Sequence, residues 1–387
     1  MASGAWQEPR KKNILRIITG PPFDTAYGTW STMKSKIMKM GKARTVRWLV
    51  IGLLAGISWP LTAQKKDKPL ERIAFGSCDH QNNPVKLWDK VLAQDPDLWI
   101  WGGDNVYGDT DNMDTLRNKY ARQKSNPGYS RLRESVKITG TYDDHDYGVN
   151  DGGREYRFRD QSRDILFDFL DIPADDPARK RRGAYHSRTY GPKGRQVKVI
   201  NLDTRFFRDP LKKVSYTDPQ SGKQEQRYEP TEGLDILGEE QWAWLERELK
   251  GSKASIHIIN SSIQVVSEQH RFEKWANFPT ARKRLFDLIA RSGAKGVVIL
   301  SGDRHIAEVS RIDLKGLPYP LYDLTSSGLT HTWGTPRPEE NSHRVGNLIV
   351  KRNFGLIRID WKKGKPEVTF EILGHDEKAY ARYGMKL

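Results

Sequence analysis

Residues of the kinds that bind metal ions follow four of the strands that the sequence predicts. Each group comes directly after an apolar run with strand character. Ligands in open α/β sheets gather beyond the carboxyl ends of the strands, so these groups are expected to meet there. They stand in the segments FGSCD, GGDNVY, YDDHDYGVND and LSGDRH, and the candidate metal ligands in them are Cys78, Asp104, Tyr107, Asp143, Asp144, Asp303 and His305.

Each group taken alone has a structural explanation. Asp and Asn are ordinary turn formers after a strand, and Cys78 could be a small buried hydrophobic residue. The combination is harder to explain in that way. Asp303 and His305 are two residues apart, so on a strand both side chains point to one face. The carboxylates on either side of His145 repel one another unless a cation compensates them, so the groups together predict a metal centre.

The donor types narrow the choice of metal and reaction. Thiolate, phenolate, imidazole and carboxylate together suit a redox metal such as Fe(III), whereas carboxylate and amide oxygens suit Ca²⁺ or Mg²⁺. Asp104 follows two glycines that allow close backbone approach, so it is placed to bridge two ions. Two adjacent metal ions can hold the attacking and leaving oxygens of an in-line displacement at phosphorus. These donors therefore predict hydrolysis of phosphate esters.

The elements that must position these residues alternate between strand and helix in the first half of the chain. Later strands follow one another directly, which indicates an α/β sandwich of mixed sheets rather than one parallel sheet. Residues 185–190 and 196–203 are expected to pair as a hairpin around GPKG. The polar stretch 210–230 is expected to be a surface insertion. Further strands are predicted at 72–78, 97–104, 136–142, 256–263, 297–301, 321–325, 355–361 and 368–373, and helices at 84–94, 163–170, 239–250 and 281–291.

The N-terminal segment predicts export. From Met40 a basic start precedes an apolar run of about a dozen residues and a small residue at Ala63, the pattern of a signal peptide at 40–63. An uncleaved signal anchor is the alternative, although the run is short against the ~20 residues of a membrane span. Residues 1–39 are then an upstream extension, for which a mis-assigned start codon is one explanation, and 70–387 form a single catalytic domain. We expect a periplasmic or secreted protein without a transmembrane span after cleavage. Its one cysteine, Cys78, excludes an internal disulfide.

The charge of the chain bears on its partners. The net charge is +16, and residues 1–63 and the remainder each contribute about half of it. A mildly basic surface would suit anionic substrates or an acidic cell envelope, and a mixed solvated surface is the alternative. No Lys/Arg-rich helix or nucleic-acid motif is present, so we expect no specific nucleic-acid recognition.

Five of these motifs in order resemble those of a known family. FGSC, GDNVY, YDDHDYGVND, LDTR and LSGDRH are similar to the motifs of the alkaline phosphatase D family, the PhoD-like branch of the calcineurin-type metallophosphoesterases. The likeness covers about residues 70–375 and includes LGEEQWAWLERELK and WANFP. Other members of the superfamily begin with Asp-x-His and end with Gly-His-x-His, where this chain has FGSC and GDRH. The resemblance implies a metallophosphoesterase β-sandwich flanked by helices in αββα layers.

The resemblance also implies roles for the candidate residues. His145 resembles the histidine that faces the leaving group, as a proton donor or phosphate contact. Arg205, in LDTR, would contact phosphate or brace the DDHD loop, since Arg commonly pairs with carboxylates. Fe(III) and Ca²⁺ are the implied metals, with another divalent ion as an alternative. Cys78, Tyr107, Asp303, His305 and Asp104 resemble the iron ligands, and Asp104, Asp144 and the neighbouring Asp143 resemble the calcium side.

The substrate remains open between small-molecule and lipid phosphate esters, and between monoesters and diesters. A phospholipase, a nucleotide diesterase on the same scaffold, and a non-catalytic metal-dependent envelope binding protein are the competing interpretations. Candidates for the rim of the site, for which a structural role is the more ordinary explanation, are Tyr147, Arg154, Trp275 and Trp333.

Overall fold

The computed structural model describes residues 68–387, apart from 85, 220, 335–338, 363–365 and 377. The predicted leader at 40–63 and the upstream residues 1–39 lie outside the described residues. The described residues belong to one compact unit. Among them, no helix is long and apolar enough to cross a membrane.

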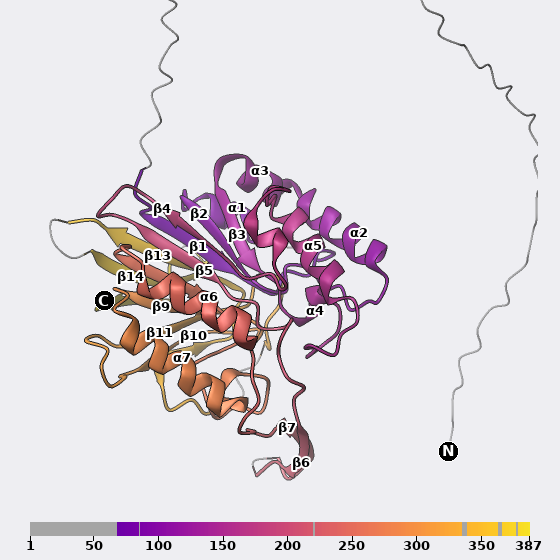
Figure 1. The fold of residues 1–387 in the computed structure, drawn as a ribbon. Coiled ribbons are helices and arrows are strands. Elements are labelled where there is room, and N and C mark those ends of the chain that lie inside the picture. Colours follow the sequence, from indigo (N-terminus) through magenta and orange to yellow (C-terminus); the bar gives the residue numbers. More distant parts are fainter. Residues whose placement is uncertain (1–67, 85, 220, 335–338, 363–365, 377) are drawn as a thin grey trace, which may run out of the picture. The chain divides into compact units, whose positions relative to one another are not determined.

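Two mixed sheets form the centre of this unit (Figure 1). The first has six strands in the order β15-β14-β13-β1-β2-β3, and β1, β2 and β3 are parallel. Every residue of β2 (LWIWG) is buried, which is typical of a parallel strand covered on both faces. The strands are β1 (Arg72–Gly76), β2 (Leu98–Gly102), β3 (Lys137–Thr141), β13 (Asn353–Asp360), β14 (Glu367–Gly374) and β15 (Ala381–Met385).

The second sheet has seven strands in the order β12-β10-β11-β9-β8-β5-β4. Its central strands β5, β8, β9 and β11 are parallel, and the outer strands run antiparallel to their neighbours. The strands are β4 (His186–Tyr190), β5 (Val197–Asn201), β8 (Ile256–Asn260), β9 (Val297–Ser301), β10 (Ala307–Ile312), β11 (Leu321–Ser326) and β12 (Arg344–Ile349). A separate hairpin, β6 (Lys213–Thr217) with β7 (Gln224–Tyr228), extends from the sandwich (Figure 1).

Helices cover the outer face of each sheet (Figure 1). The first sheet packs against α1 (Trp88–Leu92), α2 (Met113–Lys124), α3 (Pro127–Ser135) and α5 (Arg159–Phe169). The second packs against α6 (Gly238–Lys250) and α7 (Pro279–Ser292), which turn amphipathic faces toward it. The remaining helical elements are α4 (Asp144–Tyr147), η1 (Pro177–Lys180) and η2 (Trp275–Asn277).

Alternation along the strands divides the apolar side chains among three cores. On β2, Leu98 and Ile100 face the second sheet, while Trp99 and Trp101 pack under the helices of the first sheet. A third core lies between the second sheet and α6 and α7, where Trp242 and Leu285 meet strand residues. These cores give the αββα layers that the sequence predicts, so that prediction is confirmed.

The carboxyl ends of the parallel strands of both sheets meet at one edge. Asn260, at the end of β8, donates from Nδ2 to the carbonyl of Trp101 on β2 at 2.9 Å. Thr141, at the end of β3, donates to the carbonyl of Leu202 at 2.7 Å. These bonds join the two sheets where their parallel strands end. The loops that carry the candidate ligands leave the strands there.

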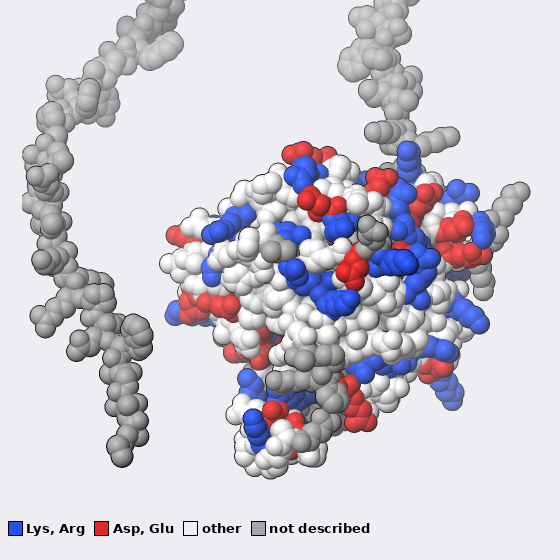
Figure 2. Space-filling model, turned by 180° about the vertical axis from the view of Figure 1, so that it is seen from behind, with Lys and Arg blue, Asp and Glu red and all other residues white. Residues whose placement is uncertain are grey.

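Several elements differ from the sequence prediction. The helix expected at 84–94 is only Trp88–Leu92, and turns precede it in which Lys86 pairs with Asp79. Helices α2 and α3 and strands β10, β12 and β15 were not predicted from the sequence. The polar stretch at 210–230 holds the β6–β7 hairpin. On the face shown in Figure 2, basic and acidic side chains are interspersed, which fits a mixed solvated surface there.

Candidate metal centre

The loops that carry the candidate ligands have unusual backbone conformations. Cys78, Asp104, Asp303 and His305 have φ values of 60°, 50°, 67° and 53°, in the left-handed region that residues other than glycine rarely adopt. Each such residue costs on the order of 1–3 kcal/mol, and residues of this kind cluster at functional sites. Four of the predicted ligands therefore share this uncommon backbone conformation at one edge of the sandwich.

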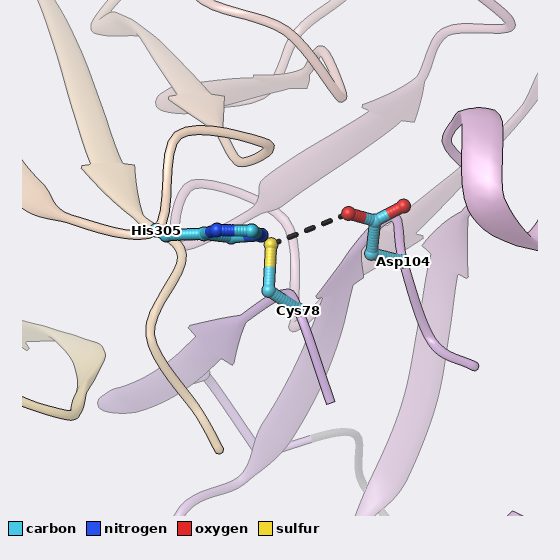
Figure 3. Close-up of side chains that lie close together, drawn as sticks. All are labelled: Cys78, Asp104 and His305. Atoms are coloured by element: carbon cyan, nitrogen blue, oxygen red, sulfur yellow. Dashed lines mark hydrogen bonds between the residues drawn. The ribbon is translucent and has the colours of Figure 1, made fainter. Parts of the chain in front are cut away.

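The Cys78 thiol, the Asp104 carboxylate and the His305 ring converge from three strand ends (Figure 3). The Cys78 sulfur donates to Oδ2 of Asp104 at 3.4 Å. Cys78 is fully buried, and burial together with the charges of Asp104 and Asp303 raises the pKa of its thiol. A nearby cation would favour the thiolate, which is the form that binds metals.

Tyr107 and two histidines complete this side of the centre. The Tyr107 hydroxyl lies 3.0 Å from Nε2 of His305 and 2.9 Å from Nε2 of His331. The two histidine Nε2 atoms are 3.2 Å apart. His331 was not among the residues singled out from the sequence, because THTWG has no spacing typical of a ligand motif. Its place beside Tyr107 and His305 makes it a further candidate.

The carboxylates form a second group around Asp104. Ligand atoms of Asp104, Asp143, Asp144 and Asp303 all lie within 4.8 Å of one another. Gly103 makes this approach possible, since a Cβ there would lie 2.6 Å from Cβ of Asp143. Oδ1 of Asp104 and Oδ2 of Asp143 are buried and have no hydrogen-bond partner. Burial and the neighbouring carboxylates Asp143 and Asp144 raise the pKa of Asp303 well above its usual range.

The buried carboxylates and the mixture of donor types fit a site for metal ions. Buried carboxylate oxygens without partners are costly unless a cation or a donor satisfies them. Burial and the charge of Asp144 raise the pKa of Asp104, so the ionised cluster needs positive charge. Thiol, phenol and imidazole donors stand on one side of Asp104 and oxygen donors on the other. The donor set fits metal ions, and Asp104 belongs to both groups of donors.

His145 lies beside the carboxylate group and is held by Asp109. Its Nδ1 is 2.7 Å from Oδ1 of Asp109, and its ring centroid is 4.3 Å from that of Tyr107. Burial opposes protonation, but the hydrogen bond to Asp109 and the charges of Asp104 and Asp144 raise the pKa of His145 to about 11. The Asp109 contact fixes the ring orientation and leaves Nε2 free to act on a bound molecule.

Comparison with known proteins identifies the family. A model of the PhoD-like phosphatases matches residues 73–353, which is most of the chain. The chain belongs to the PhoD-like phosphatase family. It is 23% identical over 292 residues to alkaline phosphatase D of Bacillus subtilis, in a match that covers 65% of this chain and 48% of that protein, about half its length.

One solved structure agrees with the PhoD-like fold. The structure titled "Structure of PhoD" matches with a TM-score of 0.63 and 17% identity, over 82% of this chain and 69% of that chain. A more distant match is "GAP50 the anchor in the inner membrane complex of Plasmodium", with a TM-score of 0.49 and 10% identity, over 83% of this chain and 90% of that chain. At 17% identity the likeness to the first of these structures supports the sandwich fold alone.

Arg205 in this PhoD-like site contacts carboxylates on two loops. It is fully buried, and its Nε donates to Oδ1 of Asp143 at 2.6 Å. Its Nη1 donates to Oε2 of Glu273 at 2.6 Å, and Glu273 also pairs with Arg208 at 3.1 Å. Of the two roles considered for Arg205, this geometry supports bracing the DDHD loop. Glu273 belongs to an acidic group with Asp144 and Asp151, and both arginines pair with its carboxylate.

Two further aspartates of the PhoD-like motifs position the loops and are not members of the ligand cluster. Asp146 accepts hydrogen bonds from the backbone amides of Asp104, Asn105 and Asp143 at 2.7–3.1 Å. Asp79 pairs with Lys86 and accepts from Gln123. The sequence could not separate these carboxylates from ligands, because all of them follow strands.

Of the four rim candidates of the PhoD-like site, two are buried and two are exposed. Tyr147 and Trp275 are fully buried, so they are core residues and not part of a rim. The side chain of Arg154 is 58% exposed and pairs with Asp209. Trp333 is exposed, and its ring lies 5.8 Å from that of His305. Only Trp333 is exposed and next to a candidate ligand.

Proposed function

We propose that this chain is an exported, metal-dependent hydrolase of phosphate esters. The observation that carries the proposal is the convergence of Cys78, Tyr107, His305 and four carboxylates at the strand ends, where Cys78 and three of the carboxylates are buried. Such a cluster needs cations, and paired cations are suited to displacement at phosphorus. Membership of the PhoD-like phosphatases supports the same reaction.

The metal ions that we propose are Fe(III) and Ca²⁺. Cys78, Tyr107 and His305 would hold the iron together with Asp104 and Asp303, because thiolate, phenolate and imidazole suit a redox metal. Asp104, Asp143 and Asp144 would hold the calcium, since carboxylate oxygens are the ligands that it prefers. When bound, the metals would activate water as the nucleophile and stabilise charge on the phosphoryl oxygens.

Residues of the chain supply positioning and proton transfer. Arg205 holds Asp143 in place through Nε, and Asp146 holds the Asp104 loop through the backbone amides of Asp104 and Asn105. Asp109 accepts from Nδ1 of His145. With Nδ1 engaged, Nε2 of the imidazolium can give its proton to the departing alkoxide, which is general acid catalysis. His145 and Arg205 are thus proposed as proton donor and positioning residue.

The substrate that we propose is a phosphate ester of a small molecule or a lipid, met outside the cytoplasm. Export is supported by the leader pattern at residues 40–63. Monoesters and diesters share this chemistry, because both are opened by attack at phosphorus. The chain has no motif for specific nucleic-acid recognition.

Hydrolysis assays test the proposal. Purified protein should hydrolyse 4-nitrophenyl phosphate, its diester or a phospholipid, and lose this activity on treatment with a chelator. Asp303→Asn should lower kcat/KM by roughly 100-fold or more, because it removes a charged ligand. Asp95→Asn is the matched control, since that exposed carboxylate pairs only at the surface. No turnover of any of the three esters with metal bound would favour a binding protein instead.

A further inference from the structure

Two exposed apolar side chains flank the candidate metal centre. Among the described residues, Val149 and Trp333 are the only large hydrophobic side chains classed as exposed, each at 41%. Val149 follows α4, four residues after His145, and the ring of Trp333 lies 5.8 Å from that of His305.

Trp333 also lines a large cavity. The cavity has a volume of about 760 Å³, which is within the range of about 300–1,000 Å³ typical of sites for organic ligands. One wall is formed by Trp333 and Phe272, whose ring centroids are 5.5 Å apart. The β6–β7 hairpin also lines the cavity, with Tyr216, Arg227 and Tyr228.

Two residues that line the cavity, Trp333 and Tyr228, are connected to candidate ligands of the metal centre, which do not themselves line it. On one side, Nε1 of Trp333 donates to the carbonyl of Arg304 at 2.6 Å, directly before His305. On the other, the Tyr228 hydroxyl donates to Asp151. The backbone amide of Asp151 in turn donates to Oδ2 of Asp144 at 2.7 Å. A molecule in the cavity would therefore be separated from His305 by Trp333, and from Asp144 by Tyr228 and Asp151.

The cavity walls suit flat organic groups. Arg271 and Arg304 stack on Phe272 with guanidinium carbons 4.9 and 4.1 Å from the ring centroid. Arg227 stacks on Tyr216 at 5.2 Å. Arg271, Phe272, Tyr216 and Arg227 line the cavity, so planar groups make up part of its surface, whereas Arg304 is buried. Such groups gain most from a planar ring, through stacking and cation–π contacts.

We propose that this cavity binds the leaving alcohol of the ester and favours alcohols built on a flat ring. The proposal rests on the proposed hydrolysis and names the substrate class of the same site. In that reaction water adds to phosphorus, the bond from phosphorus to the alcohol oxygen breaks, and the alcohol departs with a proton. The phosphoryl group would lie at the metal centre and the ring between Trp333 and the β6–β7 hairpin.

Substrate comparison tests this assignment. Trp333→Ala should raise KM for 4-nitrophenyl phosphate by roughly tenfold, since base–aromatic stacks contribute a similar amount. KM and kcat for glycerol 3-phosphate, which has no ring, should stay within about twofold of wild type. Trp333→Phe should recover most of the aryl binding, because it keeps a ring. Val149→Ala is the matched control, since it shortens the other exposed apolar side chain, which does not line the cavity.

Binding of uncleavable analogues separates this proposal from the proposed function. By calorimetry, the wild type should bind benzylphosphonate more tightly than methylphosphonate, and Trp333→Ala should remove the difference. Equal effects of Trp333→Ala on both esters would overturn the proposal, because Trp333 would then act through His305. No effect on either ester would also overturn it. If neither ester is hydrolysed but the difference in phosphonate binding depends on Trp333, the proposed hydrolysis fails and the cavity assignment holds.

Discussion

Replacing Arg205 by methionine separates a bracing role from a substrate contact. The Arg205 side chain is 0% exposed, and it pairs with Asp143 and Glu273, which are equally buried. Glu273 would keep Arg208 as a partner, whereas Asp143 would lose its only ion-pair partner among the described residues. Breaking a buried pair by removing one member costs about 3–5 kcal/mol, because the other charge is left uncompensated. We therefore expect Arg205→Met to lower the free energy of unfolding by that amount.

Denaturant unfolding in the presence of a chelator measures this cost without a contribution from bound metal. Adding Asp143→Asn to Arg205→Met should recover part of the loss, since the orphaned charge is removed with its partner. The control is Arg284→Met, which breaks an exposed pair with Glu239 and should cost at most about 1 kcal/mol. If Arg205→Met is as stable as the wild type yet inactive, Arg205 contacts substrate and the bracing role is wrong.

Three further changes test other parts of the structure. Cys78→Ser should lose most of the bound iron while circular dichroism shows a retained fold, and full iron content by elemental analysis would exclude the thiol as a ligand. Asp104→Asn should lower kcat/KM by roughly 100-fold or more in steady-state assays, and wild-type turnover would contradict a bridging role. Burial lowers the pKa of His186 to about 4, so the unfolded state, with a His pKa of about 6.5, binds more protons below neutrality. The free energy of unfolding should therefore fall by about 2 kcal/mol from pH 7 to pH 5 through this residue. In urea titrations at pH 7 and pH 5, the free energy of unfolding of His186→Gln should fall by about 2 kcal/mol less than that of the wild type. If both proteins show the same fall, His186 does not cause it.

The fold was predictable from the sequence wherever apolar periodicity was strong. The run VVILS became β9 as predicted, and the amphipathic pattern after Gly238 became α6. Helix α2 was missed because its segment MDTLRNKYARQK has few apolar residues, and only Leu116, Tyr120 and Gln123 are buried. Its capping residue Asn112, which accepts from the amide of Thr115 at 2.9 Å, was the available signal.

The candidate site was predictable in residue type but not in the division of roles. Ligand-type residues after strands indicated the edge at which they meet, because parallel strands end together. Chain order could not show that Asp146 accepts three backbone amides while Asp144 remains in the carboxylate group. His331 and Asp109 escaped notice for a related reason. They reach the site from loops, and only the packing of those loops brings them to Tyr107 and His145.

Metal removal and reconstitution test the central claim most directly. Elemental analysis of the purified protein and its rate on 4-nitrophenyl phosphate would be followed through chelation and the return of iron and calcium. The account predicts that bound metal and hydrolysis are lost together and restored together. Full hydrolysis by the metal-free protein, or a metal-loaded protein that hydrolyses no phosphate ester, would contradict it.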